Sequence, residues 1–132
     1  MTNLKRKEPN KIKLNTNENV DYNLSNPIFS FKYLQDKFAF KNRKELENKH
    51  YKNFLLKIET LSKLTWHDII NLPRENGMEN ITLSIQAPNF ITDDITLKSI
   101  RFGSIERIIG YRKDNIFYVL FIDINGSCYK HD

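Results

Sequence analysis

The last thirty-two residues of the chain, 101–132, constrain its fold more than any other stretch. Two runs rich in β-branched and aromatic residues, 107–112 and 115–123, are joined by a short Asp-Asn link. Asn125-Gly126 adds a second turn signal, because Asn and Gly tolerate the positive φ that tight hairpin turns require. The segment therefore predicts a β-meander at the end of the chain.

The middle of the chain predicts two helices. Between Glu45 and Leu64, apolar residues recur at three- and four-residue spacing, which places them on one stripe of a helix of about five turns. The stripe comprises Tyr51, Phe54, Leu55, Ile58 and Leu61. Thr65-Trp-His-Asp68 then predicts the capping box of a second helix, and Leu72-Pro73 ends that helix early.

Three further stretches alternate apolar and polar residues, as half-buried strands do: 27–34, 81–86 and 95–102. The links between the later strands are short, which favours antiparallel neighbours. We therefore predict an α+β domain over 27–132, with a mostly antiparallel sheet of four to six strands packed on one long and one short helix. The expected order is β-α-α-β-β-β, with room for one more strand. Residues 1–26 are Lys/Asn-rich without apolar periodicity, which predicts a flexible basic arm.

Charge is distributed unevenly. The chain carries a net charge of +5, with +3 in residues 1–20, +4 in 21–64, −3 in 65–100 and +1 in 101–132. A basic excess in the arm and the first helical region favours a polyanionic partner such as RNA, DNA or an acidic protein, and the alternative is an ordinary solvated surface. Cys128 is the only cysteine, and no segment resembles a signal peptide or a membrane span, so a reducing, cytoplasmic location is expected.

The terminal meander also collects residues that could contact RNA. Alternation places Arg107 and Tyr111 on one face of a strand and Arg112 on the other. Basic and aromatic side chains on an exposed sheet suit phosphate contact and base stacking. The alternative is that the tyrosines line a sheet edge and that the arginines pair with Glu106 and Asp114.

His131 could act as a general acid or base near neutral pH, with a cation stabilising phosphate charge. Glu106 would be its partner if the sheet brought the two together. As the penultimate residue, His131 could equally lie free in solvent.

The order of elements, in a small basic chain that ends in a curved sheet with Arg, Tyr and His, resembles the RelE/ParE superfamily of toxins over about residues 28–132. The resemblance implies a metal-independent endoribonuclease that cleaves messenger RNA and is neutralised by a small antitoxin. It implies that Arg107, Arg112, Tyr129 and His131 are catalytic. The tail also resembles small bacterial and phage-borne proteins whose ends read Arg-x-x-Gly-aromatic-Arg, then an aromatic strand, then Asp.

The leading hypothesis is accordingly a toxin-like endoribonuclease or RNA-binding protein of a bacterial or phage mobile element. Its nucleic-acid-binding residues would be Lys5, Arg6, Lys7, Arg43, Lys44, Tyr111 and Lys113. The second hypothesis is a non-catalytic interaction module, such as a phage accessory factor or an inhibitor of a nucleic-acid enzyme, which docks through a strand edge or the arm. No cofactor or metal is expected, because the sequence has no Gly-rich phosphate loop and no metal-ligand spacing.

Overall fold

The computed structural model describes residues 20–130 of the chain. The two helices are α1 (Asn48–Ser62) and α2 (Trp66–Ile70), and the five strands are β1 (Ile28–Ser30), β2 (Met78–Asn80), β3 (Lys98–Arg101), β4 (Arg107–Lys113) and β5 (Ile116–Asp123). The predictions made for Lys5, Arg6, Lys7 and His131 fall outside the described residues. None of the described helices is long and apolar enough to cross a membrane.

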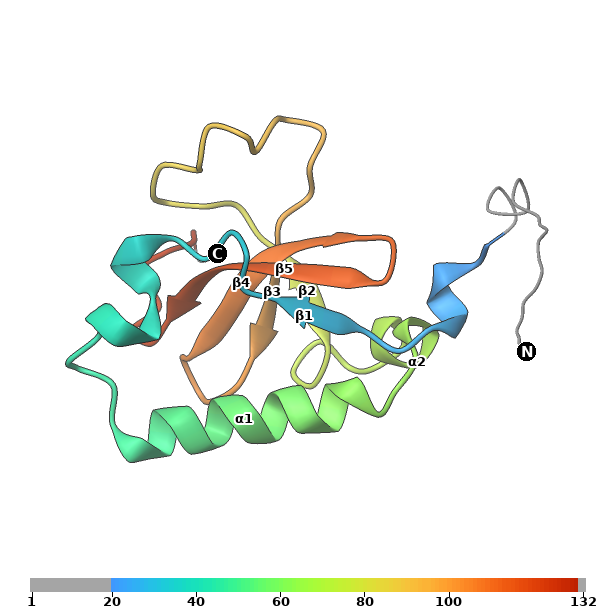
Figure 1. Cartoon of the computed structure of the whole chain (residues 1–132), viewed down its shortest axis with the longest axis horizontal. Helices are drawn as coiled ribbons and strands as arrows, with labels where there is room; N and C mark the ends of the chain where they lie inside the picture. Colours follow the sequence, from blue (N-terminus) through green and yellow to red (C-terminus); the bar gives the residue numbers. More distant parts are fainter. Residues whose placement is uncertain (1–19, 131–132) are drawn as a thin grey trace, which may run out of the picture.

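The strands form one sheet in the order β1-β5-β4-β3-β2. All neighbours are antiparallel except β1, which pairs in parallel with β5 through Ile28 and Ile116. Figure 1 shows β1 beside the terminal hairpin of β4 and β5, with α1 running below the sheet. The predicted α+β class and the mostly antiparallel sheet on one long and one short helix are confirmed.

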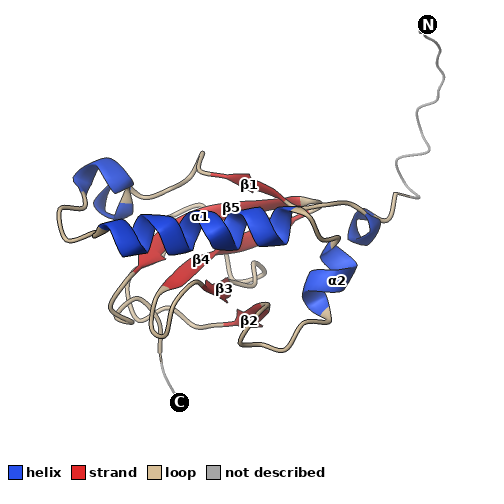
Figure 2. Cartoon of the chain, turned by 90° about the horizontal axis from the view of Figure 1, so that it is seen from below, coloured by secondary structure: helices blue, strands red, loops and turns tan. Residues whose placement is uncertain are grey.

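Both faces of the sheet are covered. Helix α1 lies across one face, as Figure 2 shows, and buries Phe54 and Leu61 against it. On the opposite face, the loop 81–97 and the tail after β5 pack over a second apolar cluster. That cluster comprises Leu97, Ile109, Leu120, Phe121, Cys128 and Tyr129, with Ile81, Leu83, Ile85 and Ile91 packed against it. The expectation of one solvent-exposed sheet face does not hold, because this irregular loop supplies a second apolar layer.

The terminal strands contain one irregularity that simple alternation does not predict. Ile109 pairs with Phe121 but Gly110 pairs with Val119, so Leu120 is an extra residue in β5. Such a bulge turns two consecutive side chains to the same face. Leu120 and Phe121 therefore both belong to the cluster under the loop, while Ile122 packs with Val119 on the helix side.

The stretch 81–86 does not form the predicted strand. Ile81, Leu83 and Ile85 still place their side chains toward the sheet, which explains the apolar alternation. The backbone, however, pairs mainly with the tail, through one bridge between Leu83 and Tyr129 and neighbouring hydrogen bonds, and Ile81 donates to the carbonyl oxygen of Leu97. The strand in this region is β2 instead, three residues directly after Gly77.

The second predicted turn is present but begins no further named strand. Gly126 has a φ of 75°, as the Asn-Gly signal requires. The carboxylate of Asp123 accepts backbone N–H groups from the four residues 125–128, which winds the chain around that side chain. The tail is thereby directed across the sheet toward the loop 81–97.

The first described residues, 20–26, belong to the segment that the sequence predicted to be a flexible arm. Residues Tyr22–Leu24 form one turn of 3-10 helix. Beside it, the backbone N–H of Trp66 donates to Ser25 and the side-chain amide of Asn26 donates to Leu64. These bonds tie the segment to α2, whose Thr65–Asp68 capping box forms as predicted.

Candidate anion-binding site

A pair of facing arginines marks the candidate site. In the register of β3 and β4, Arg101 lies directly opposite Arg107. Their side chains are on the face that carries Ser99 and Ile109, because residues two apart on a strand share a face. Like charges directly opposite each other destabilise a sheet. A site that brings two guanidinium groups together therefore gains from an anion between or beside them.

The two arginines line a pocket of about 510 Å³ at the β2 edge of the sheet. The tail and the start of the loop 81–97 complete its walls. Its lining comprises Arg74, Glu79, Asn80, Ile81, Thr82, Arg101, Arg107, Tyr129 and Lys130. Four of these side chains are cationic and one is a carboxylate, so the pocket is strongly positive.

Several buried polar atoms at this place have no hydrogen-bond partner. Among residues 20–130 these atoms are Glu79 Oε1, Ser99 Oγ, Arg101 Nε and Arg107 Nε. All four belong to one face of the neighbouring strands β2, β3 and β4, since Glu79 pairs with Ser99 in the register. A buried polar group left unpaired costs about 1–3 kcal/mol. Three of the four residues, Glu79, Arg101 and Arg107, line the pocket, so the unpaired atoms gather at its wall.

Arg107 is held rigidly within this site. Its side chain is only 6% exposed. Its Nη1 lies 3.4, 3.2 and 3.0 Å from the carbonyl oxygens of Gly103, Ser104 and Glu106. The guanidinium therefore fixes the β3–β4 loop and is itself fixed by it, so the charge needs no reorganisation when an anion arrives. The side chain of Arg101 makes no hydrogen bond or ion pair with any described residue.

The tail is positioned by Asp123 and by the loop 81–97. The backbone N–H of Lys130 donates to Thr82 at 2.8 Å, which brings Lys130 and Tyr129 to the pocket wall. Cys128, the residue before Tyr129, is 1% exposed. Burial, followed by the neighbouring charge of Asp123, raises the pKa of the Cys128 thiol to about 12. The thiol is therefore protonated at neutral pH and does not serve as a nucleophile.

The predicted catalytic residues are only partly brought together. Arg107 and Tyr129 line the same pocket. Arg112 lies on the opposite face of β4, where its guanidinium carbon is 4.4 Å from the ring centroid of Trp66 and its Nε donates to the carbonyl oxygen of Asp114. Burial lowers the pKa of Arg112. Arg112 therefore supports the hairpin over α2 and is separate from the pocket.

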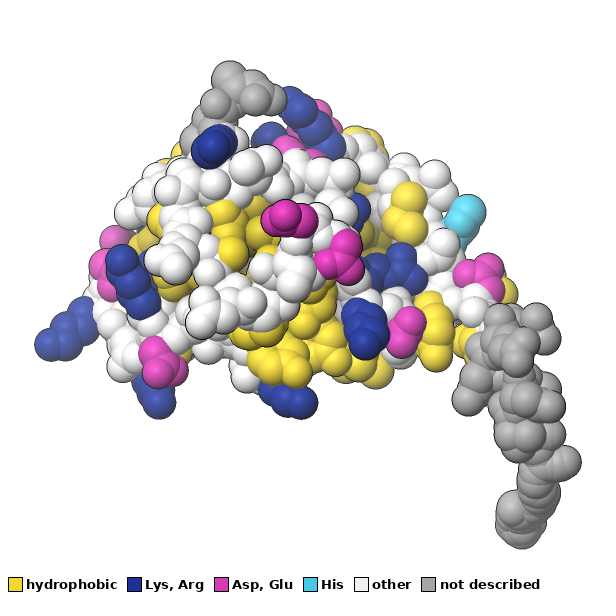
Figure 3. Space-filling view, turned by 90° about the horizontal axis from the view of Figure 1, so that it is seen from above, with side chains coloured by type: hydrophobic (Ala, Val, Ile, Leu, Met, Phe, Trp, Pro, Cys, Tyr) yellow, Lys and Arg dark blue, Asp and Glu magenta, His cyan; other side chains and the backbone are white. Residues whose placement is uncertain are grey.

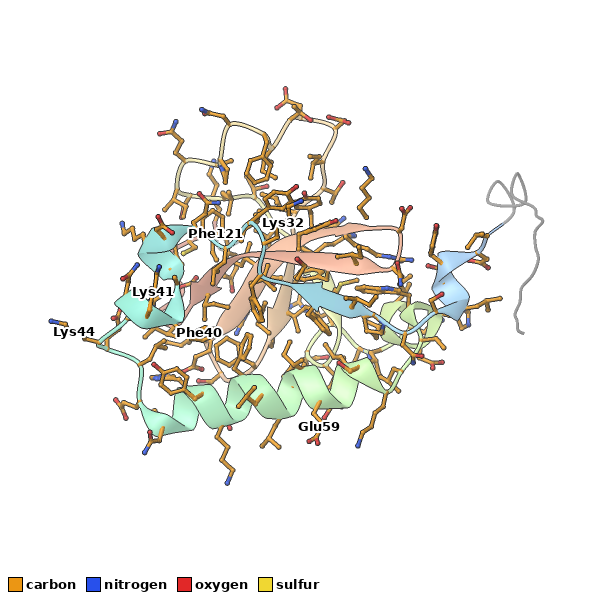
Figure 4. The ribbon with its side chains drawn as sticks, in the orientation of Figure 1. Lys32, Phe40, Lys41, Lys44, Glu59 and Phe121 are labelled. Atoms are coloured by element: carbon orange, nitrogen blue, oxygen red, sulfur yellow. The ribbon has the colours of Figure 1, made fainter. Side chains whose placement is uncertain are left out.

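The other basic and aromatic residues expected to bind nucleic acid have different environments. Arg43 is buried and donates to the carbonyl oxygen of Ile122 at 2.7 Å and to Glu45 at 2.8 Å, which gives it a structural role. Lys44 is exposed and points away from the domain at the turn before α1 (Figure 4). Neither residue lies at the pocket.

Tyr111 and Lys113 line a separate hollow with Arg112 and Lys98. Tyr111 stacks on Tyr118 with ring centroids 5.2 Å apart, and burial raises the pKa of its hydroxyl. Figure 3, which views the molecule from the side of the loop 81–97, shows apolar side chains exposed between polar segments on this side. This hollow is a second cationic surface, next to aromatic rings.

Glu106 has a partner other than the one expected from the sequence. Its Oε2 lies 3.6 Å from Nε2 of His50, a buried side chain at the first turn of α1. Nδ1 of His50 accepts the backbone N–H of Glu47, so the neutral ring carries its proton on Nε2 and directs it toward Glu106. This pair joins the β3–β4 loop to the start of α1.

Sequence reasoning missed Glu79 and Arg74, and it considered Arg101 and Lys130 without including them among the predicted site residues. A signal for Arg101 was present: it and Arg107 flank the link of residues 102–106, so a hairpin pairs them directly. Glu79 carried no signal, because β2 is short and was not predicted. Residues 20–130 hold no group of three His, Cys, Asp or Glu side chains arranged to bind a metal ion. Comparisons with protein-family models, curated proteins and solved structures found no match.

Proposed function

We propose that the protein binds RNA and that the pocket at the β2 edge receives a backbone phosphate. The observation that carries this proposal is a pair of arginines, Arg101 and Arg107, that lie opposite each other in the sheet and line one pocket, and whose buried Nε atoms have no partner. Guanidinium groups present a planar fork of donors that matches phosphate oxygens. Arg74 and Lys130 add two cations to the same wall.

RNA is favoured over an isolated anion because positive charge extends beyond the pocket. The hollow lined by Lys98, Arg112 and Lys113 lies at the other end of the same strands, next to Tyr111. Several cations and an aromatic ring spread over one molecule suit a strand with repeated phosphates and exposed bases. The basic residues 1–20 would add contacts to the same polyanion.

We also propose that the protein cleaves the RNA that it binds. Arg101 and Arg107 would stabilise charge on the non-bridging phosphate oxygens, and Tyr129 and His131 are the tail residues closest in sequence to Lys130 at the pocket wall. A cytoplasmic toxin of a mobile element, countered by an antitoxin, would act in this way.

The test uses Arg101→Gln, because no described residue depends on the Arg101 side chain for a hydrogen bond. Binding of a fluorescent single-stranded RNA 12-mer is followed by anisotropy over a series of salt concentrations. We expect Arg101→Gln to weaken binding about tenfold, the size of one charge-assisted hydrogen bond, and to lower the salt slope by about 1. Lys52→Gln, the same charge change on the exposed side of α1, is the matched control and should differ little from the parent.

Equal affinities for the parent and Arg101→Gln would refute the phosphate site. The same samples on a denaturing gel report cleavage. Cut RNA from the parent and intact RNA from Arg107→Lys would support an endoribonuclease, whereas uncut RNA throughout would leave binding alone.

A second candidate function is protein docking through the outer side of α1. Leu55 and Leu56 are 64% and 47% exposed there, and Figure 4 shows Glu59 on the same outer side of the helix. Lys52 and Glu59 flank these leucines in a shallow apolar hollow. A partner such as an antitoxin would cover them. Changing Leu55 and Leu56 to Ser would then abolish association with that partner and leave RNA affinity unchanged.

A further inference from the structure

The cationic pocket contains one carboxylate that a pure phosphate site does not need. Glu79 lines the pocket among four cations, yet it forms no hydrogen bond or ion pair with any described residue. Its Oε1 is buried and unpaired. A carboxylate repels a phosphate and can only accept hydrogen bonds. Its presence therefore indicates a ligand that brings a hydrogen-bond donor next to an anionic group.

The sheet places Glu79 and the arginines at suitable separations. Glu79 pairs with Ser99 across β2 and β3, and Arg101 follows two residues later on the same face. Glu79 and Arg101 are thus diagonal neighbours, with backbones about 7–8 Å apart. Long side chains reach two different groups of one ligand across that separation. Arg107 lies opposite Arg101, one strand farther from Glu79.

A nucleotide of RNA carries such a pair of groups. The phosphodiester offers only acceptors at neutral pH, and the neighbouring ribose 2′-hydroxyl offers a donor. Pockets of roughly 300–1,000 Å³ hold small ligands, and the volume of about 510 Å³ falls in this range. A DNA strand lacks the 2′-hydroxyl and would leave Glu79 unpaired beside a phosphate.

We propose that Glu79 accepts a hydrogen bond from the ribose 2′-hydroxyl next to the phosphate held by Arg101 and Arg107, and that the protein thereby prefers RNA to DNA. The inference rests on the proposed phosphate site and adds the discrimination between the two nucleic acids. Contact with the 2′-hydroxyl is how a protein distinguishes RNA from DNA at a single position. The pocket lies at the edge strand β2 of the sheet.

The test compares three single-stranded 12-mers of the same base sequence: RNA, DNA and RNA with 2′-O-methyl groups, which keep an oxygen but cannot donate. The proteins are the full chain, Glu79→Met, Glu79→Gln and Arg101→Gln. Met removes the acceptor at similar length, whereas Gln keeps an oxygen that accepts without charge. Thermal unfolding of each variant, followed by circular dichroism, establishes that binding is measured on folded protein.

We expect the parent to bind RNA about five- to tenfold more tightly than DNA or the 2′-O-methyl strand, the size of one such hydrogen bond. Glu79→Met should bring that ratio close to one, and Glu79→Gln should retain part of it. Arg101→Gln should weaken all three ligands by a similar factor and keep the ratio.

Two outcomes would overturn the 2′-hydroxyl contact. The parent could bind the three strands with equal affinity, or the ratio of RNA affinity to DNA affinity could be the same in Glu79→Met as in the parent. In either case the phosphate site stands if Arg101→Gln still weakens binding. A different result separates the two proposals. If Arg101→Gln has no effect on any strand, the phosphate site itself is wrong, and the 2′-hydroxyl contact falls with it.

Discussion

The carboxylate of Asp123 is the anchor of the tail, and its removal should both destabilise the fold and disturb the pocket. Asp123 is 1% exposed at the end of β5. Its Oδ1 accepts the backbone N–H groups of Asn125, Gly126 and Ser127 at 3.3, 3.0 and 3.3 Å, and its Oδ2 accepts that of Cys128 at 3.1 Å. One side chain thus accepts four backbone N–H groups of the turn, of which that of Ser127 also donates to the side chain of Asn125.

The magnitude follows from which of these donors water can reach after Asp123→Ala. The N–H of Cys128 is buried, and leaving it unpaired costs about 1–3 kcal/mol. The other three donors are in partly exposed residues, where water replaces part of what is lost. Hydrogen bonds to a charged group contribute about 1.5–3 kcal/mol each when intact, so a total loss of about 3–5 kcal/mol is expected. That is a large share of the roughly 5–15 kcal/mol that holds a typical domain folded.

The assay is urea unfolding followed by tryptophan fluorescence, which Trp66 provides as the only tryptophan. Asp93→Ala is the matched control, because Asp93 is exposed in the loop 81–97, and it should change the free energy of unfolding by less than about 0.5 kcal/mol. RNA affinity of folded Asp123→Ala should also fall, since Tyr129 and Lys130 lose their position at the pocket wall. A free energy of unfolding within about 0.5 kcal/mol of the parent would refute this account of the tail.

Three further predictions concern other parts of the fold. Gly110→Ala should lower the free energy of unfolding by about 3 kcal/mol or more, because a Cβ at this position would clash with the carbonyl oxygen of Tyr118. An unfolding curve like that of the parent would contradict this close approach. Iodoacetamide should leave Cys128 unmodified in the folded protein at pH 8, because burial raises the pKa of its thiol to about 12, and should modify it in urea. Mass spectrometry measures the labelling, and rapid labelling of the native protein would contradict the burial of the thiol. The Asp68 carboxyl should titrate below 3.8 in an NMR pH series, because its hydrogen bonds with the backbone and side chain of Thr65 lower its pKa. Its stabilising effect is present above 3.8 and is lost as pH falls through the lower folded-state pKa, and Thr65→Val should move the titration back toward 3.8.

The candidate site could be predicted only in part. Of the predicted catalytic residues, Arg107 and Tyr129 line one pocket. Strand alternation had already placed Arg112 on the other face of β4, and the structure finds it over Trp66. Glu79 could not be predicted, because its strand is three residues long and is recognised only through its pairing with β3.

By itself, the sequence determined the local structure wherever a single period or turn signal was strong. The apolar stripe produced α1, the Thr65–Asp68 box began α2, and the Asp114 turn, with a φ of 59°, joined β4 to β5. These features depend on neighbours within a few residues, so they can be read along the chain.

Only the tertiary structure decided which segments meet across long separations. The parallel pairing of β1 with β5, the burial of the second sheet face and the extra residue in β5 all depend on contacts between distant parts of the chain. The pocket has the same origin, because β2, the β3–β4 hairpin and the tail each supply part of its wall. A side chain's type is local, but its burial and its partners are set by the packing of the whole domain. For that reason the sequence indicated basic and aromatic residues in the terminal segment, and the fold showed two facing arginines at one pocket beside an unpaired carboxylate.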